Sequence, residues 1–304
     1  MKNLLVTKSV LFCIAIIVGG IAFLLYSLSN NSGDDITKRL TLKAEQGDAV
    51  AQFNLGLKYD KGQGVAQDYV KAVYWYTKSA EQGHTDAQYN LGSMYFFGRG
   101  VSQDYIKALY WYTKSAEQGN AGGQSNLGLM YAGGLGIAQD YTKAVYWFTK
   151  AAEQGDAWAQ FTLGLMYEKG RGRALDYTKA AYWYTKSAEQ GNADAQFNLG
   201  AMYDKGQGVA QDHIKAVYWY TKSAEQGHAV AQFNLGARYA TGLGIAQDST
   251  KAVYWLTKAA EQGNAGAQLA LGVMYASGKG IVQDYTKAVY WYTTAAEQGD
   301  AWVQ

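Results

Sequence analysis

The sequence predicts an all-α protein: a right-handed α-solenoid of seven 36-residue helix-turn-helix repeats that follows an N-terminal transmembrane helix. Three observations predict it. The 304 residues include 36 Gly, 26 Tyr and 9 Trp but no Pro, a bias that indicates copying of one motif. The first 28 residues contain a long uncharged run. The tripeptide Glu-Gln-Gly recurs every 36 residues, with its glycines at Gly47, Gly83, Gly119, Gly155, Gly191, Gly227, Gly263 and Gly299.

The uncharged run from Val10 to Tyr26 reaches the roughly 17 to 25 residues that span a bilayer. We therefore assign residues 1–9 to a cytoplasmic N-terminal tail and 10–28 to a transmembrane signal-anchor helix. Lysines precede the run and aspartates follow it, which by the positive-inside rule places the repeats on the far side of the membrane. The alternative is a signal peptide cleaved near Ser27-Leu28-Ser29, although the apolar region exceeds the usual 7 to 15 residues.

Residues 29–47 are predicted to form a linker and a partial capping helix, and 48–299 the seven repeats. In the first repeat, Ala51, Leu55 and Tyr59 recur at intervals of four, which predicts one face of a helix. Asp48 precedes this helix as a predicted N-cap. Gly62-Gln63-Gly64 ends it, because glycine readily adopts positive φ.

The second helix of the repeat begins after Asp68, an aspartate in all seven copies and a predicted N-cap. Ala72, Trp75, Tyr76 and Ala80 share one face of this helix. Glycine inside a helix costs roughly 1 kcal/mol relative to alanine, so Gly56 in the first helix predicts close contact with Trp75 or Tyr76. Neither short helix buries its apolar face alone, and neighbouring repeats must stack.

The chain ends with residues 300–304, which match 156–160 and are interpreted as the start of a truncated eighth repeat. A truncated reading frame, a fragment, or an open end that packs on another copy each explains this ending. The single cysteine, Cys13, lies in the apolar segment, so residues 48–299 contain no cysteine for a disulfide or thiolate metal site.

Three motifs in residues 48–299 resemble the Sel-one-like repeat family, a relative of the tetratricopeptide repeats. They are Ala-Gln-Phe-Asn-Leu-Gly-x-x-Tyr, Gly-x-Gly-Val-x-Gln-Asp-Tyr-x-Lys-Ala and Trp-Tyr-x-Lys-x-Ala-Glu-Gln-Gly. Local departures occur at Arg173, Leu175, His213 and Ser249. The resemblance implies an adaptor that assembles other proteins, in a family with many bacterial, exported members. With the apolar segment, it predicts the bacterial inner membrane with the repeats facing the periplasm, or a secreted or periplasmic protein if the segment is cleaved.

Other functions lack support in the sequence. The formal net charge of +2 shows no excess suited to nucleic acid. The repeated Gly-x-Gly follows a helix and lacks a third glycine, so it is not a dinucleotide motif. His84, His213 and His228 have no metal-ligand spacing, and the aspartate column has no partner base. We therefore predict no enzymatic activity, no cofactor and no metal.

The candidate binding surface is a stripe opposite the core face of the first helix. It comprises positions 50, 54, 57 and 61 of the first repeat and the equivalent residues of the other repeats, which follow at intervals of 36 and are named by the same position numbers. A protein or peptide of unknown identity is the expected partner, held in the concave groove. An amide both donates and accepts hydrogen bonds, so a ladder of asparagines can pair with an extended peptide backbone, the alternative being bonds within each repeat or to water. The ladder, broken at Thr162 and Ala270, comprises Asn54, Asn90, Asn126, Asn198 and Asn234. The variable candidates are Asp86, Trp158 and Asp194 at position 50, and Lys61, Phe97, Lys169 and Lys205 at position 61.

Two further hypotheses concern function. The repeats either act as a general scaffold or bind one cell-envelope enzyme as its regulator or inhibitor. In addition, Tyr74 and its equivalents form a predicted outward ridge flanked by Lys71 and Lys78. Lysine stems that cover the rings explain this ridge, and the alternative is a docking surface for an acidic or phosphate-bearing partner.

Overall fold

The computed structural model describes residues 36–300, and the predicted transmembrane helix at 10–28 lies outside them. Within the described range, helices are joined by short turns without any strand, and none of these helices is long and apolar enough to cross a bilayer. A helical segment at residues 36–45 precedes the repeats.

Each repeat forms two helices, all of 13 residues except the last, and the consecutive pairs stack as a solenoid. The first helices are α2 (Ala49–Lys61), α4 (Thr85–Phe97), α6 (Ala121–Gly133), α8 (Ala157–Lys169), α10 (Ala193–Lys205), α12 (Ala229–Thr241) and α14 (Ala265–Ser277). The second helices are α3 (Tyr69–Glu81), α5 (Tyr105–Glu117), α7 (Tyr141–Glu153), α9 (Tyr177–Glu189), α11 (His213–Glu225), α13 (Ser249–Glu261) and the longer α15 (Tyr285–Asp300).

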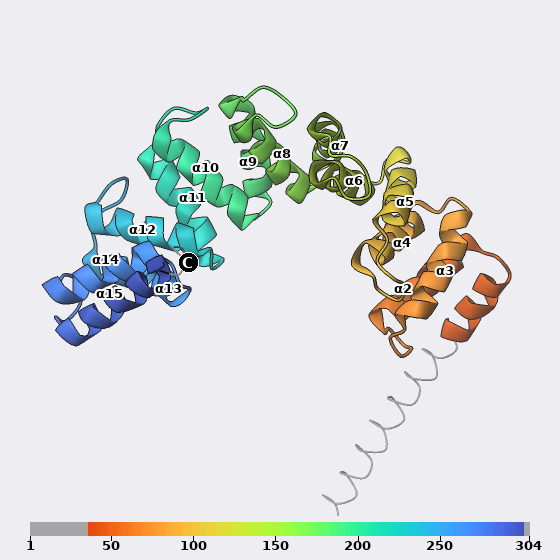
Figure 1. The fold of residues 1–304 in the computed structure, drawn as a ribbon, viewed down its shortest axis with the longest axis horizontal. Coiled ribbons are helices and arrows are strands. Elements are labelled where there is room, and N and C mark those ends of the chain that lie inside the picture. Colours follow the sequence, from red (N-terminus) through yellow and green to blue (C-terminus); the bar gives the residue numbers. More distant parts are fainter. Residues whose placement is uncertain (1–35, 301–304) are drawn as a thin grey trace, which may run out of the picture. The chain divides into compact units, whose positions relative to one another are not determined.

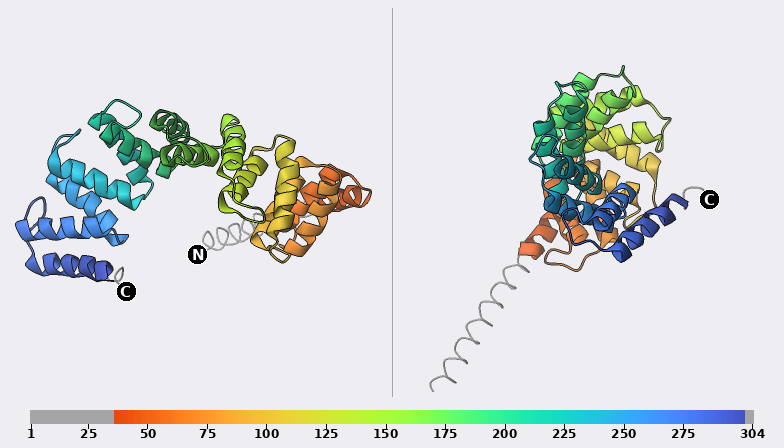
Figure 2. Two further views of the ribbon diagram at one scale, coloured as in Figure 1. Left: turned by 45° about the horizontal axis from the view of Figure 1, so that its top comes forward. Right: turned by 90° about the vertical axis from the view of Figure 1, so that its left-hand side faces the viewer.

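The chain divides into two compact units. The first extends to Gly123 and includes Leu135–Ile137, and the second comprises Gln124–Gly134 and the chain from Ala138 onward. Within the second unit, α8 to α15 follow one another in chain order, each first helix beside its second helix (Figure 1). Two further views show the same order (Figure 2). The right-handed sense of the solenoid stays a prediction.

The predicted helix caps are confirmed. Asp48 accepts a hydrogen bond from the Ala51 amide at 2.8 Å, and Asp68 accepts one from the Lys71 amide at 3.0 Å. These bonds satisfy amide groups that have no partner inside the helix. Gly62 ends α2 with φ of 67°, a conformation that glycine adopts without strain.

The core is made mainly from small and aromatic side chains. Leu55, Ala72 and Tyr76 are fully buried. A side chain at Gly56 would place its Cβ 2.7 Å from Cδ1 of Tyr76, which confirms the predicted close approach and identifies tyrosine as the neighbour. The tryptophans lie less deep than the sequence suggests: Trp75 is buried, whereas Trp147 and Trp183 are half-buried. Trp183 packs on the edge of the core of the preceding repeat.

A ladder of glutamine pairs, each with one buried member on the first helix, joins successive helices. The side-chain amide of Gln52 donates to the Ala44 carbonyl at 3.0 Å, and the amide of Gln82 donates to the Gln52 side-chain oxygen at 2.7 Å. The bond between paired glutamines recurs in each repeat, as Gln118–Gln88, Gln154–Gln124, Gln190–Gln160, Gln226–Gln196, Gln262–Gln232 and Gln298–Gln268. Because buried amides must find partners, these bonds fix how the helices within each unit pack on one another.

Candidate peptide-binding face

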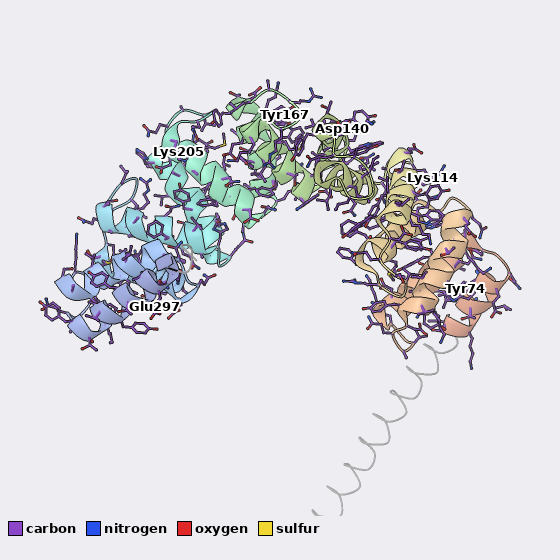
Figure 3. The ribbon with its side chains drawn as sticks, in the orientation of Figure 1. Tyr74, Lys114, Asp140, Tyr167, Lys205 and Glu297 are labelled. Carbon is purple, nitrogen blue, oxygen red and sulfur yellow. The ribbon has the colours of Figure 1, made fainter. Side chains whose placement is uncertain are left out.

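The variable candidate residues lie on the surface of the first helices. Trp158 and Phe97 are 42% and 60% exposed, and the Asp194 side chain is 62% exposed. The lysines at position 61 are exposed too, including Lys205, the last residue of α10 (Figure 3). These side chains are therefore accessible to a partner, and their role in binding stays a prediction.

The asparagine column is less exposed, and the structure gives part of it a partner. Asn54 is exposed, whereas Asn90, Asn126, Asn198 and Asn234 are half-buried. The Asn90 side chain interacts with the Tyr76 hydroxyl of the preceding repeat, and Asn198 interacts with Tyr184 in the same way. These contacts reach a neighbouring repeat, whereas the sequence-based alternatives were bonds within each repeat or to water.

Two of the buried tyrosine hydroxyls donate to a carboxylate at the end of the first helix of their own repeat. The Tyr184 hydroxyl donates to Oε2 of Glu168 at 2.6 Å, and that of Tyr76 donates to Oδ2 of Asp60 at 3.4 Å. Burial raises the pKa of both phenols well above the ordinary value, and the neighbouring carboxylates raise it further. Each of these two hydroxyls therefore stays protonated and donates to its carboxylate.

The asparagine column and the buried tyrosine column are interrupted in the same places along the chain. The asparagine column is broken only at Thr162 and Ala270. The tyrosine column is the position of Tyr76 in the second helix and its equivalents 36 residues apart, such as Tyr112, Tyr184 and Tyr220. In this column Phe148 and Leu256, which have no hydroxyl, lie fourteen residues before Thr162 and Ala270. In the repeats of Phe148 and Leu256, the position that Asp60 and Glu168 occupy elsewhere is taken by Ala132 and Ala240. A comparison of the columns fourteen residues apart would have revealed this partner from the sequence.

A side-chain amide has two N–H donors and one carbonyl acceptor, so contact with one tyrosine hydroxyl does not use all of its hydrogen-bonding groups. Whether the asparagines bind a peptide stays a prediction.

Asn54 lies in a different environment, at the start of the first unit. It lines a hollow of about 450 Å³ between residues 36–45 and α2. The basic side chains of Arg39, Lys43 and Lys58 line this hollow, together with Ile36, Leu40, Leu57 and Gln63. Lys58 also donates to the Gln63 carbonyl at 3.2 Å.

One polar cluster links the fifth and sixth repeats. Asp204 lies 2.9 Å from Nδ1 of His213 and pairs through its other oxygen with Arg238. Arg238 occupies a column in which most repeats have a buried methionine. His213, a departure from the repeat pattern, thus contributes to packing between repeats rather than only to its loop.

The tyrosine ridge has the structure expected for covered rings. Tyr74 on α3 (Figure 3) is half-exposed, and Nζ of Lys78 lies 5.2 Å from its ring centroid. Lys71 does not flank this ring, because it lies 5.3 Å from the centroid of Tyr59 and 3.2 Å from Asp68. Such cation–π contacts contribute to packing at exposed sites, so the lysine-covered ridge needs no ligand to explain it.

The residues described by the structure contain no cluster of three or more His, Cys, Asp or Glu side chains that is suited to a metal ion. The exposed face of the first helices carries amides, aromatic and aliphatic side chains and scattered charges.

The profile of the Sel1 repeat matches the chain seven times, at residues 49–84, 85–120, 121–156, 159–192, 193–228, 229–264 and 265–300. The chain belongs to the Sel1 repeat family. These matched ranges coincide with the helix pairs that the structure shows. Sel1 repeats are typically non-enzymatic modules of protein–protein interaction.

Solved Sel1 repeat structures resemble the chain closely. The protective antigen c5321 of uropathogenic Escherichia coli, which displays an SLR fold, is 41% identical with a TM-score of 0.83, over 86% of this chain. A Sel1 repeat protein of Oxalobacter formigenes is 39% identical with a TM-score of 0.69, over 89% of this chain and 78% of that one. This chain spans 56% of the length of the Escherichia coli structure. A comparison with curated proteins found no match.

Proposed function

We propose that this Sel1 repeat protein is a membrane-anchored scaffold that binds an extended peptide or protein segment along the exposed face of its first helices. The anchor is the apolar segment at residues 10–28. The repeats face the periplasm of a bacterial cell, with the anchor in the inner membrane. The protein has no catalytic role of its own.

The combination of a regular asparagine column with exposed, variable residues on the same helices carries the proposal. On α10, Asn198 is half-buried near the Tyr184 hydroxyl, and the variable residues Asp194 and Lys205 are exposed. Constant amides suit the constant peptide backbone, and variable neighbours suit the side chains that differ between ligands. The same face therefore supplies both general affinity and selectivity.

The sequence supports anchoring and orientation. Val10 to Tyr26 carries no charge, Lys2 and Lys8 precede it, and Asp34 and Asp35 follow it. This asymmetry favours a cytoplasmic amino terminus and repeats on the other side.

Affinity capture from solubilised membranes tests the proposal if it compares two matched variants. The first variant carries Asn198→Thr and Asn234→Thr, a replacement that the chain itself has at position 162. The control carries Tyr182→Phe and Tyr218→Phe on the second helices, at exposed positions. We expect the asparagine variant to lose the partner at unchanged thermal stability and the control to retain it.

Equal capture by both variants contradicts binding on the first-helix face. A drop in melting temperature without selective loss of the partner shows that the asparagines are structural. Assay of any captured enzyme, with and without the repeats, separates a general scaffold from a regulator or inhibitor.

A further inference from the structure

An apolar hollow opens on the proposed binding face between α12 and α14. Its volume is about 390 Å³, within the range of small-molecule and side-chain pockets. Leu256 and Met274 are its buried residues, and Phe233, Ala237 and Ala270 also line it. Lys279 is the charged residue of the lining.

The hollow exists because this pair of repeats has lost the tyrosine arrangement. Leu256 replaces the buried tyrosine, Ala240 the carboxylate and Ala270 the asparagine. Gly266 occupies position 50, where Val50, Trp158 and Val230 lie in other repeats. Each change removes volume or a polar group, so the space becomes wider and apolar.

The third and fourth repeats show what such a space accepts. Phe148 also lacks the hydroxyl, and Thr162 replaces the asparagine beside it. Here the indole of Trp158, at position 50, packs edge-on against Phe148 with 5.5 Å between ring centroids. An aromatic ring of the chain itself therefore fills the position that Gly266 leaves open.

Charge adds a second requirement. None of the residues that line the hollow is acidic, and among the described residues no carboxylate lies within 4.0 Å of the Lys279 amine. Lys279 is exposed, so it can attract an anionic group of a ligand without losing an existing ion pair.

We propose that the hollow between α12 and α14 binds a tryptophan or similar aromatic side chain of an extended peptide, next to an acidic residue that pairs with Lys279. This specificity rests on the proposed function, because it adds a selective pocket to the same face. The pocket anchors the peptide, while the asparagines hold its backbone. Desolvated aromatic anchors commonly dominate the energy of such interfaces.

Methyl NMR of methionine tests the pocket directly with the full chain in lipid nanodiscs, which avoids competition by detergent. Met274 lines the hollow, and Met94, Met130, Met166 and Met202 occupy the equivalent position in other repeats as internal controls. The probe is the end-blocked peptide Gly-Ser-Asp-Trp-Ser-Gly. We expect it to shift the Met274 methyl signal and leave the other four unchanged.

Two changes in the peptide and two in the protein sharpen the test. Replacing the peptide Trp by Ser should abolish the shift, and replacing Asp by Lys should weaken it several-fold. Gly266→Trp copies the filled arrangement and should abolish the response. The new Cβ would lie 3.2 Å from the ring of Phe233, a contact that a small ring movement relieves. Trp158→Gly should open a second hollow and make Met166 respond.

Three results overturn the proposal. They are no Met274 shift at millimolar peptide, a shift that persists in Gly266→Trp, and a shift that depends on protein concentration without peptide, which indicates a second copy as the occupant. Partner capture separates this failure from failure of the scaffold function. A partner lost by the asparagine variant but retained by Gly266→Trp supports the face and rejects the pocket.

Discussion

Replacing Tyr184 with phenylalanine removes one buried hydroxyl and leaves the ring in place. The hydroxyl donates to Glu168 at 2.6 Å and interacts with Asn198. A hydrogen bond to a charged group contributes about 1.5 to 3 kcal/mol. The Glu168 side chain is 27% exposed, so water hydrates part of it when the tyrosine hydroxyl is absent. We therefore expect Tyr184→Phe to destabilise its repeat by about 1 to 2 kcal/mol.

Hydrogen exchange measures this loss where it occurs, because solenoid repeats open locally. Amides of α9 and α10 should exchange about tenfold faster in the variant, since about 1.4 kcal/mol changes an equilibrium tenfold. Tyr182→Phe is the control, because Tyr182 is 53% exposed and carries the same chemical change. Exchange in Tyr184→Phe equal to that in the control would refute the role assigned to the hydroxyl.

Four further predictions test the packing and the topology. Gln196→Ala removes a buried bridge between repeats and should cost about 1 to 3 kcal/mol in urea unfolding. Burial and the nearby Asp204 raise the pKa of Tyr220 to about 12 from the ordinary 10. The protonated Tyr220 hydroxyl therefore stabilises the fold fully below pH 10, and this stabilisation is lost as the pH rises through about 12. Phenylalanine cannot ionise, so Tyr220→Phe should lose less helicity than the parent over this pH range in circular dichroism. Deletion of Asp156–Gly191 should leave a helical, less stable chain, and loss of all helicity would contradict modular packing. A reporter fused after Gln304 should be active in the periplasm, and cytoplasmic activity would reverse the proposed orientation.

The repeat unit itself was readable from the sequence because its local signals agree. An aspartate equivalent to Asp68 precedes the second helix of each repeat, because capping requires a side-chain oxygen at this position. Gly56 recurs inside a helix, where only a packing demand explains it, and the Tyr76 ring supplies that demand. Such features follow from spacing within one repeat.

Contacts between repeats were harder to predict. Helical periodicity predicts which face of a helix is apolar, but not how deeply a side chain on that face is buried or which residue of the next repeat it contacts. Trp183 shares a face with buried residues, yet it reaches the edge of the preceding core and stays half-buried. Asn198 was assigned to the surface by its angle around the helix, but stacking brings Tyr184 against it. The hollow beside Gly266 likewise depends on side chains from three helices.

Site-specific photo-crosslinking in living cells tests most directly whether the first-helix face binds a partner. A photoreactive phenylalanine analogue replaces Asp194 on α10 in one variant and Tyr182 on α9 in the other, both exposed positions of the same unit. We expect a discrete crosslinked species from position 194 that disappears when Asn198→Thr and Asn234→Thr are added, and none from position 182. Crosslinking from position 182 alone, or from position 194 regardless of the asparagines, would contradict binding on this face.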